Sequence, residues 1–368
     1  MTRRVIPWWW SFGLFVIVSW LLWRALGIRQ GADTAFYLAG GRALLDGKLP
    51  AGVTIGWAYV GYWWFIALHQ ALGLGLGAIV LTQWLLSGGA LLALYDLGRR
   101  LAGPTAGAIA AALAALNVDV ARFTFYVLSD ALFTSLLVLA LYATYRALTT
   151  ATRAWRIGAA ALCVAMATVR LNGWVMLPAL LTALVWSSTT TRRWLTLLIV
   201  GVMYLGVLAA GVARTGAAGV GVGLLWSGRV IWTDDASAIT MPAPPPRPPD
   251  RNGWRAAIVP YVVRHPVACA QLAARRILTE LVHVRRVYSA RHNAMIWLTL
   301  PPLYVLAATG WWRHRRERFA RLCAAVVGAQ LLLVGVTAAD WDGRYLLMVL
   351  PVITLWSAVG IAQLIRSA

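Results

Sequence analysis

Two acidic residues have the type and setting that chemistry on a hydroxyl group requires. The 368-residue chain contains only 12 Asp and Glu. Asp33 follows the first long apolar run in the segment GADTAFYLAGGRALLDGKLP, and Asp130 lies in VLSDALF near the start of a later run. A carboxylate in such a place can take the proton of an attacking hydroxyl. The structural alternatives are a helix cap for Asp33 and an ion pair with Arg122 for Asp130.

Two arginines could supply the opposite charge. Arg170 and Arg344 stand at the ends of apolar runs, and a planar guanidinium can bind phosphate through two parallel hydrogen bonds. The alternatives are an interfacial anchor for each arginine and an ion pair of Arg344 with Asp340 or Asp342. The five histidines show no metal-ligand spacing, so the sequence indicates no metal site.

The composition indicates that these residues are positioned by membrane helices. Hydrophobic residues make up 61% of the chain and charged residues 12%, with a mean hydropathy of +0.71, whereas about 25% of a soluble domain is charged. These values exclude a cytosolic globular enzyme and a disordered chain. The net charge of +21 comes from 33 Lys and Arg, of which only Lys48 is a lysine. We therefore expect an all-α polytopic membrane protein.

Ten apolar runs approach the length of about 20 residues that a helix needs to cross a bilayer. They are residues 8–28, 76–97, 104–116, 125–145, 157–169, 171–186, 194–213, 294–312, 320–339 and 345–365. Residues 59–72 are fewer and rich in Trp and Tyr, which is typical of an interfacial helix. The sequence thus predicts a bundle of about ten transmembrane helices, with interfacial helices in the first outer loop and a tight turn at Arg170.

The arginines also indicate how the helices are oriented. With the N-terminus inside, every short inner loop is basic, whereas the short outer turns contain only Arg122, Arg170 and Arg344. Basic loops stay in the cytoplasm, so both termini are expected to be cytoplasmic, and the positive charge does not indicate nucleic acid. All acids except Asp96 and Glu317 fall on the outer side, where we expect any acid–base chemistry.

The hydropathy pattern divides the chain into three parts. Residues 1–213 are expected to form an N-terminal membrane module that contains the catalytic first outer loop, 29–75, and residues 294–368 to form C-terminal membrane helices. Between them, residues 214–293 form a large outer loop. Its stretch 242–249 (PAPPPRPP) favours polyproline II.

Several motifs follow one another in a characteristic order. They are D-x-x-x-Y-x-A-x-x-x-x-L-x-x-G from Asp33 to Gly47, GYW at 61–63, LSD at 128–130, HP at 265–266 and RYLLxxLP from Arg344 to Pro351. This ordered set resembles the GT-C superfamily of membrane glycosyltransferases, which includes protein O-mannosyltransferases and lipid A aminoarabinose transferases. Thr34 follows Asp33 where many relatives have Glu, so a metal site shared by several acids is not expected.

The resemblance implies an inverting glycosyltransferase that moves one sugar from a polyprenyl-phosphate donor to a glycan, lipid or protein acceptor. The reaction would take place on the outer face of a bacterial plasma membrane. No cofactor is certain from the resemblance, and a divalent cation is left open although the sequence does not support one. One base suffices, because the departing phosphate has a second pKa of about 6 and needs no protonation.

The resemblance and the residue inventory together assign roles. Asp33 is expected to be the base, and Arg170 and Arg344 to bind the phosphate. The other candidates for substrate binding are Tyr37, which belongs to the Asp33 motif, Asp130, which would hold the sugar or orient an arginine, and His265, Arg285 and Arg286 of the large outer loop. A flippase or transporter of lipid-linked sugars is the alternative function, although the chain has no mid-span acid of the kind that ion coupling usually requires. A non-catalytic scaffold is the third function that the sequence leaves open.

Overall fold

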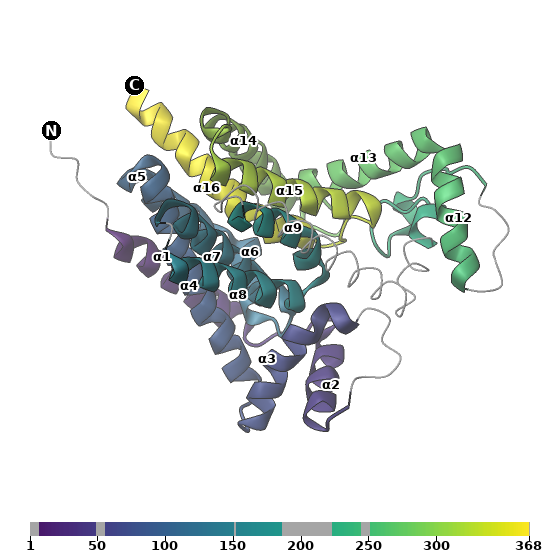
Figure 1. Cartoon of the computed structure of the whole chain (residues 1–368), viewed down its shortest axis with the longest axis horizontal. Coiled ribbons are helices and arrows are strands. Elements are labelled where there is room, and N and C mark those ends of the chain that lie inside the picture. The colour runs from purple at the N-terminus through teal and green to yellow at the C-terminus, as the bar shows by residue number, and fades with distance from the viewer. Residues whose placement is uncertain (1–6, 49–55, 151, 186–222, 244–250, 368) are drawn as a thin grey trace.

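The computed structural model describes residues 7–48, 56–150, 152–185, 223–243 and 251–367. Within these ranges the chain is helical and contains no β-strand beyond isolated bridges such as that between Arg29 and Tyr126. The prediction of an all-α fold is therefore confirmed for the described part. Figure 1 shows the helices gathered into one bundle, with α12 and α13 (green) on the side away from α1.

The helices have the following bounds: α1 Trp8–Leu26, α2 Thr34–Leu45, α3 Val60–Ala71, α4 Leu76–Ala102, α5 Pro104–Leu116, α6 Val118–Arg122, α7 Ser129–Thr150, α8 Arg153–Val169, α9 Leu171–Val185, α12 Arg251–Arg264, α13 Pro266–Val282, α14 Ala290–His314, α15 Arg318–Val336 and α16 Arg344–Ser367. Short 3-10 turns lie at Gly56–Tyr59, Phe123–Phe125 and Asp235–Ser237.

Six of the described helices are long and apolar enough to cross a membrane: α1, α4, α7, α14, α15 and α16. A seventh span results if the pair Pro104–Leu116 and Val118–Phe125, bent by 58°, is counted as one. Helices α8 and α9, with 17 and 15 residues, are shorter. The expected run at 194–213 lies outside the described residues, so the count of ten spans stays a prediction, as does the interfacial position of α3.

Two turns between helices follow directly from the sequence. Gly103 has a φ of 83°, a conformation that favours glycine, and Pro104 begins α5 at the position where proline suits a helix. Arg170 is extended between α8, which ends at Val169, and α9, which begins at Leu171. The predicted tight turn at Arg170 is therefore confirmed.

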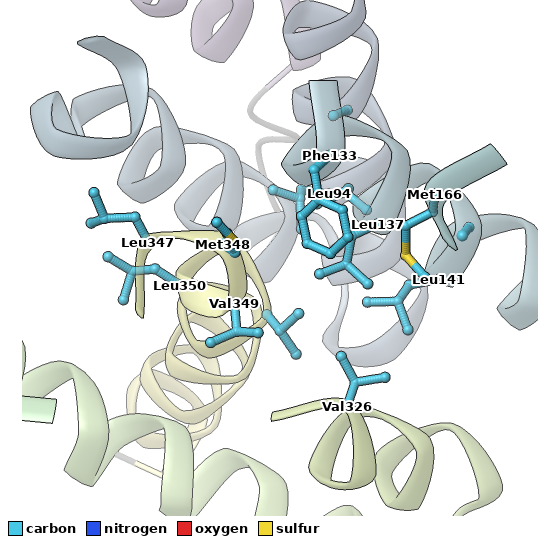
Figure 2. Close-up of a cluster of buried hydrophobic side chains, with 14 of the residues drawn as sticks. Leu94, Phe133, Leu137, Leu141, Met166, Val326, Leu347, Met348, Val349 and Leu350 are labelled. Carbon is cyan, nitrogen blue, oxygen red and sulfur yellow. The ribbon is translucent and has the colours of Figure 1, made fainter. Parts of the chain in front are cut away.

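Helix α16 lies at the centre of the bundle and packs against α14, α5, α4, α7 and α15. It is buried on nearly all sides, as a helix that is apolar all round should be. Figure 2 shows part of this core, in which Phe133 and Leu137 of α7 lie near Met348 and Val349 of α16. This packing holds α16 in the bundle, with its first residue, Arg344, at one end of the core.

The two ends of the bundle differ in charge. At one end Tyr142 donates a hydrogen bond to Asp96 over 3.0 Å, and Arg146 lies over the ring of Trp155, 4.6 Å from its centre. The guanidinium of Arg366, near the end of α16, donates to the carbonyl of Ala102 at the end of α4. This arginine-rich end is opposite the start of α16, so the helices separate the basic loops from the acidic candidates along the bundle axis.

Candidate functional site

Asp33 occupies the residue before α2, but its side chain does not cap the helix. Thr34 makes the local contacts instead: its Oγ1 accepts a hydrogen bond from the Gly31 N–H over 2.9 Å and donates one to the Val127 carbonyl over 3.0 Å. The carboxylate of Asp33 is therefore left 48% exposed, and its described ion pair is with Arg344 Nη1 at 3.5 Å. The helix-cap alternative for this side chain is wrong.

Arg344 begins α16 and faces two carboxylates. Besides Asp33, its guanidinium pairs with Asp340 at 3.3 Å, and the side chains of Arg344 and Asp340 are 20% and 2% exposed. Asp340 also accepts the backbone N–H of Asp342 over 2.9 Å. Asp340 thus holds the guanidinium in place while part of it stays accessible next to Asp33. Of the two partners that the sequence left open for Arg344, Asp340 forms the ion pair, whereas Asp342 pairs with Arg122 at 2.8 Å.

A buried ion pair joins Arg170 to Asp130. Their charged atoms are 2.8 Å apart, and each side chain is 5% exposed. The pair with Arg122 that the sequence left open for Asp130 is therefore not formed. Neither Asp130 oxygen accepts a well-aligned hydrogen bond within the described part of the chain. Asp130 also lines, with Arg344, a small cavity of about 70 Å³ between α4, α7 and α16.

Tyr37 extends this pair towards α2. Its hydroxyl is hydrogen-bonded to Ser129 Oγ over 3.1 Å, and the same Ser129 oxygen accepts a hydrogen bond from Arg170 over 3.0 Å. Burial raises the pKa of the Tyr37 phenol well above its ordinary value, so the hydroxyl stays neutral. Arg170 also lies 5.9 Å from the centre of the Tyr345 ring. The structure therefore brings together five of the expected site residues: Asp33, Tyr37, Asp130, Arg170 and Arg344.

In the part of the chain that the structure describes, the three expected residues of the large outer loop make no direct polar contact with Asp33 or Arg344, although Arg285 contacts Asp340. Arg285 is buried and donates to the carbonyls of Asp340, over 3.0 Å, and of Thr279, over 2.7 Å. Arg286 is exposed in the turn that follows. His265 precedes α13 and contacts the ring of Tyr261. Among the described residues, none of the three forms a hydrogen bond or ion pair with Asp33 or Arg344, so their part in substrate binding stays a prediction.

Glu280 is a residue that the sequence reasoning did not single out. It is fully buried in α13, where Oε1 accepts the Leu346 N–H over 2.8 Å and Oε2 accepts the Asp340 N–H over 2.9 Å. Burial raises the pKa of this carboxyl to about 7. Glu280 thus ties α13 to the start of α16 and positions both Asp340 and Arg344. The only signal in the sequence is a single acid in a helix of apolar and arginine residues.

Metal ligands do not gather in the described part of the chain, where no three His, Cys, Asp or Glu side chains come together. The carboxylates of Asp33 and Asp340 both form ion pairs with Arg344. The described site is therefore one of carboxylates, guanidinium groups and phenols. It can accept a proton and can bind an anion.

Comparisons with known proteins concern the sequence and the fold of the chain. Residues 60–213 match the family model described as dolichyl-phosphate-mannose-protein mannosyltransferase. No curated protein matches the chain.

The solved structures that resemble the chain include ArnT from Cupriavidus metallidurans in the apo state, with 18% identity and a TM-score of 0.51. ArnT bound to undecaprenyl phosphate is 18% identical to the chain, with a TM-score of 0.49. A third structure is that of the archaeal oligosaccharyltransferase AglB from Archaeoglobus fulgidus in complex with an inhibitory peptide and a dolichol-phosphate. It is 12% identical to the chain, with a TM-score of 0.48. Each match covers at least 95% of this chain, which spans 59% of ArnT and 50% of AglB. In the matched segment and in its fold, the chain resembles the GT-C superfamily of membrane glycosyltransferases.

Proposed function

We propose that the protein is an inverting glycosyltransferase that moves a single pentose or hexose from a polyprenyl-phosphate donor to an acceptor hydroxyl on the outer face of the membrane. The observation that supports this most directly is the Asp33 carboxylate, half-exposed and 3.5 Å from the Arg344 guanidinium. An accessible base beside an accessible cation is the pair that such a transfer needs. The matched family model, whose description names a dolichyl-phosphate-linked sugar, supports the choice of donor.

The reaction needs one proton acceptor. Asp33 takes the proton of the acceptor hydroxyl as its oxygen attacks the anomeric carbon of the sugar, and the proton stays on the Asp33 carboxyl. A new carbon–oxygen bond forms on the face opposite the phosphate, while the bond from the anomeric carbon to the phosphate oxygen breaks. The electron pair leaves with the oxygen as polyprenyl phosphate, so the configuration at the anomeric carbon inverts.

The departing phosphate gains negative charge, which Arg344 is placed to stabilise. Its pair with Asp33 is long, at 3.5 Å, whereas charge-assisted hydrogen bonds to phosphate take about 2.7–2.9 Å. A phosphate can therefore replace this contact while Asp340 keeps the guanidinium in position. Arg170 is buried and already bound to Asp130, Ser129 and Asn172, so we assign it to positioning rather than to direct contact with the phosphate.

The outer-face location rests on the charge difference between the two ends of the bundle. Basic loops remain in the cytoplasm, and the arginine-rich end lies opposite Arg344 and Asp33. We therefore place both termini in the cytoplasm of a bacterium and the Asp33 centre outside. The acceptor is a glycan, a lipid or a protein.

A deletion strain tests the function whichever sugar is transferred. Mass spectrometry of its lipids and glycans should reveal an acceptor that lacks one sugar, and the wild-type gene should restore the missing sugar. The Asp33→Asn variant should not restore it, whereas Asp46→Asn, an exposed acid at the far end of α2, should do so. Restoration by Asp33→Asn at normal protein level would refute the proposal. Donor that crosses vesicle membranes without product would favour the flippase alternative.

A further inference from the structure

A cavity of about 800 Å³ lies between α5, α6, α14 and α16. Its wall is formed largely by leucines, including Leu300 and Leu303 of α14 and Leu347 and Leu350 of α16. Figure 2 shows Leu347 and Leu350 on the side of α16 that faces away from Phe133. The volume falls within the range of about 300–1,000 Å³ that is typical of ligand sites. We call this cavity the α14 groove; Asp33, Asp130 and Arg170 are not among the residues that line it.

One end of the α14 groove is polar and contains an unsatisfied histidine. His283 lines the groove and is 1% exposed, yet neither of its ring nitrogens has a hydrogen-bond partner among the described residues. Burial, together with the neighbouring Arg285, lowers the pKa of this imidazole to about 4, so it is neutral at pH 7. Leaving a buried polar group unpaired costs about 1–3 kcal/mol. A ligand that supplies a hydrogen-bond partner would remove this cost.

The charges at the same end leave one cation without a partner. Asp119 pairs with Arg122 at 3.6 Å and with His292 at 3.3 Å, and Arg122 also pairs with Asp342 at 2.8 Å. Arg291 lines the groove and is exposed, and within the described part of the chain it forms no hydrogen bond or ion pair. The polar end therefore offers one uncompensated guanidinium and one neutral imidazole.

We propose that the α14 groove binds a diacyl phospholipid whose phosphodiester headgroup has a net charge of −1, its chains against the leucines and its phosphate at Arg291 and His283. One free guanidinium matches the single charge of a phosphodiester better than the nearly double charge of a phosphate monoester, which has a second pKa of about 6. The apolar wall matches acyl chains. The inference is independent of the proposed transfer reaction, because it concerns lipid retention and not turnover.

Native mass spectrometry of the purified full chain in detergent tests the proposal. The chain is titrated with dioleoyl phosphatidylglycerol, dioleoyl phosphatidylcholine or undecaprenyl phosphate. We expect phosphatidylglycerol to bind at least about tenfold more tightly than phosphatidylcholine. Arg291→Gln removes the cation and Thr299→Trp fills the groove, and each should weaken phosphatidylglycerol binding by about tenfold.

Two controls match these variants. Arg275→Gln removes an exposed arginine of α13, and Leu298→Trp adds the same ring to α14 at a residue that is 75% exposed and does not line the groove. Both should bind phosphatidylglycerol as the wild type does. Equal binding of the two phospholipids would overturn the proposal. So would unchanged binding by Arg291→Gln and Thr299→Trp, or a preference for undecaprenyl phosphate that these two variants abolish.

Discussion

Replacing Asp130 by leucine would leave the Arg170 guanidinium buried without its carboxylate partner. The two groups are 2.8 Å apart, and each side chain is only 5% exposed, so water can do little to solvate the remaining charge. Removing one partner of such a pair costs about 3–5 kcal/mol of unfolding free energy. The double variant Asp130→Leu/Arg170→Met leaves no buried charge from this pair, so it should be more stable than either single variant.

The wild type, Asp130→Leu, Arg170→Met and the double variant form a double-mutant cycle. Their unfolding free energies are measured in mixed detergent micelles with increasing dodecyl sulfate, followed by the fluorescence of the chain's 21 tryptophans. The coupling energy between the two positions should be about 2–3 kcal/mol. Asp235→Ala is the control, because its pair with Arg229 is 78% and 38% exposed and such surface pairs contribute at most about 1 kcal/mol.

An additive cycle would refute this reasoning. If the losses of unfolding free energy in the two single variants sum to the loss in the double variant within about 0.5 kcal/mol, the charges of Asp130 and Arg170 do not stabilise each other. A loss in Asp130→Leu no larger than that in Asp235→Ala would contradict the buried pair as well.

Three further predictions concern the elements around the site. Glu280 has a pKa raised from 4.5 to about 7, so its protonation favours folding, and this contribution to the unfolding free energy declines as pH rises between those values. Glu280→Gln should remove roughly 3 kcal/mol of this pH dependence of the unfolding free energy, as followed by thermal unfolding. An unchanged pH dependence would contradict the buried carboxyl. Thr34→Ala removes the hydrogen bonds of Thr34 to Gly31 and Val127 and should lower the unfolding free energy by about 1 kcal/mol, whereas Thr34→Ser should retain it in the same assay. Arg344→Lys keeps the charge but loses the bidentate geometry, and should weaken undecaprenyl phosphate binding by about tenfold or more in native mass spectrometry; equal binding would remove Arg344 from phosphate recognition.

Much of the fold could be predicted because membrane helices are encoded by continuous apolar runs. The helices α1 and α16 begin within one residue of the expected runs at 8 and 345, and Arg170 falls at the expected turn. The same pattern placed Asp33 and Arg344 on the outer side of the membrane, although they are 311 residues apart; the sequence did not predict that the two side chains form an ion pair.

The partners of Asp130 and Glu280 could not be predicted, because they depend on turns and long-range contacts that carry no periodic signal. Arg122 precedes Asp130 by eight residues, but α6 ends at Arg122 and a 3-10 turn follows before α7, so the two side chains do not share a helix. Arg170 reaches Asp130 instead, from another turn. Besides Arg285 at 3.4 Å, the partners of Glu280 are backbone N–H groups 60 and 66 residues further on, and hydropathy says nothing about these long-range contacts.

The release of polyprenyl phosphate from the donor is the measurement that bears most directly on the role of Asp33. The purified full chain is placed in vesicles with the acceptor and the sugar donor that the deletion strain identifies, and polyprenyl phosphate is quantified by mass spectrometry. If Asp33 is the base, Asp33→Asn should release it at least about 10²-fold more slowly than the wild type, while Asp46→Asn should match the wild type. Wild-type release by a folded Asp33→Asn protein would contradict the account.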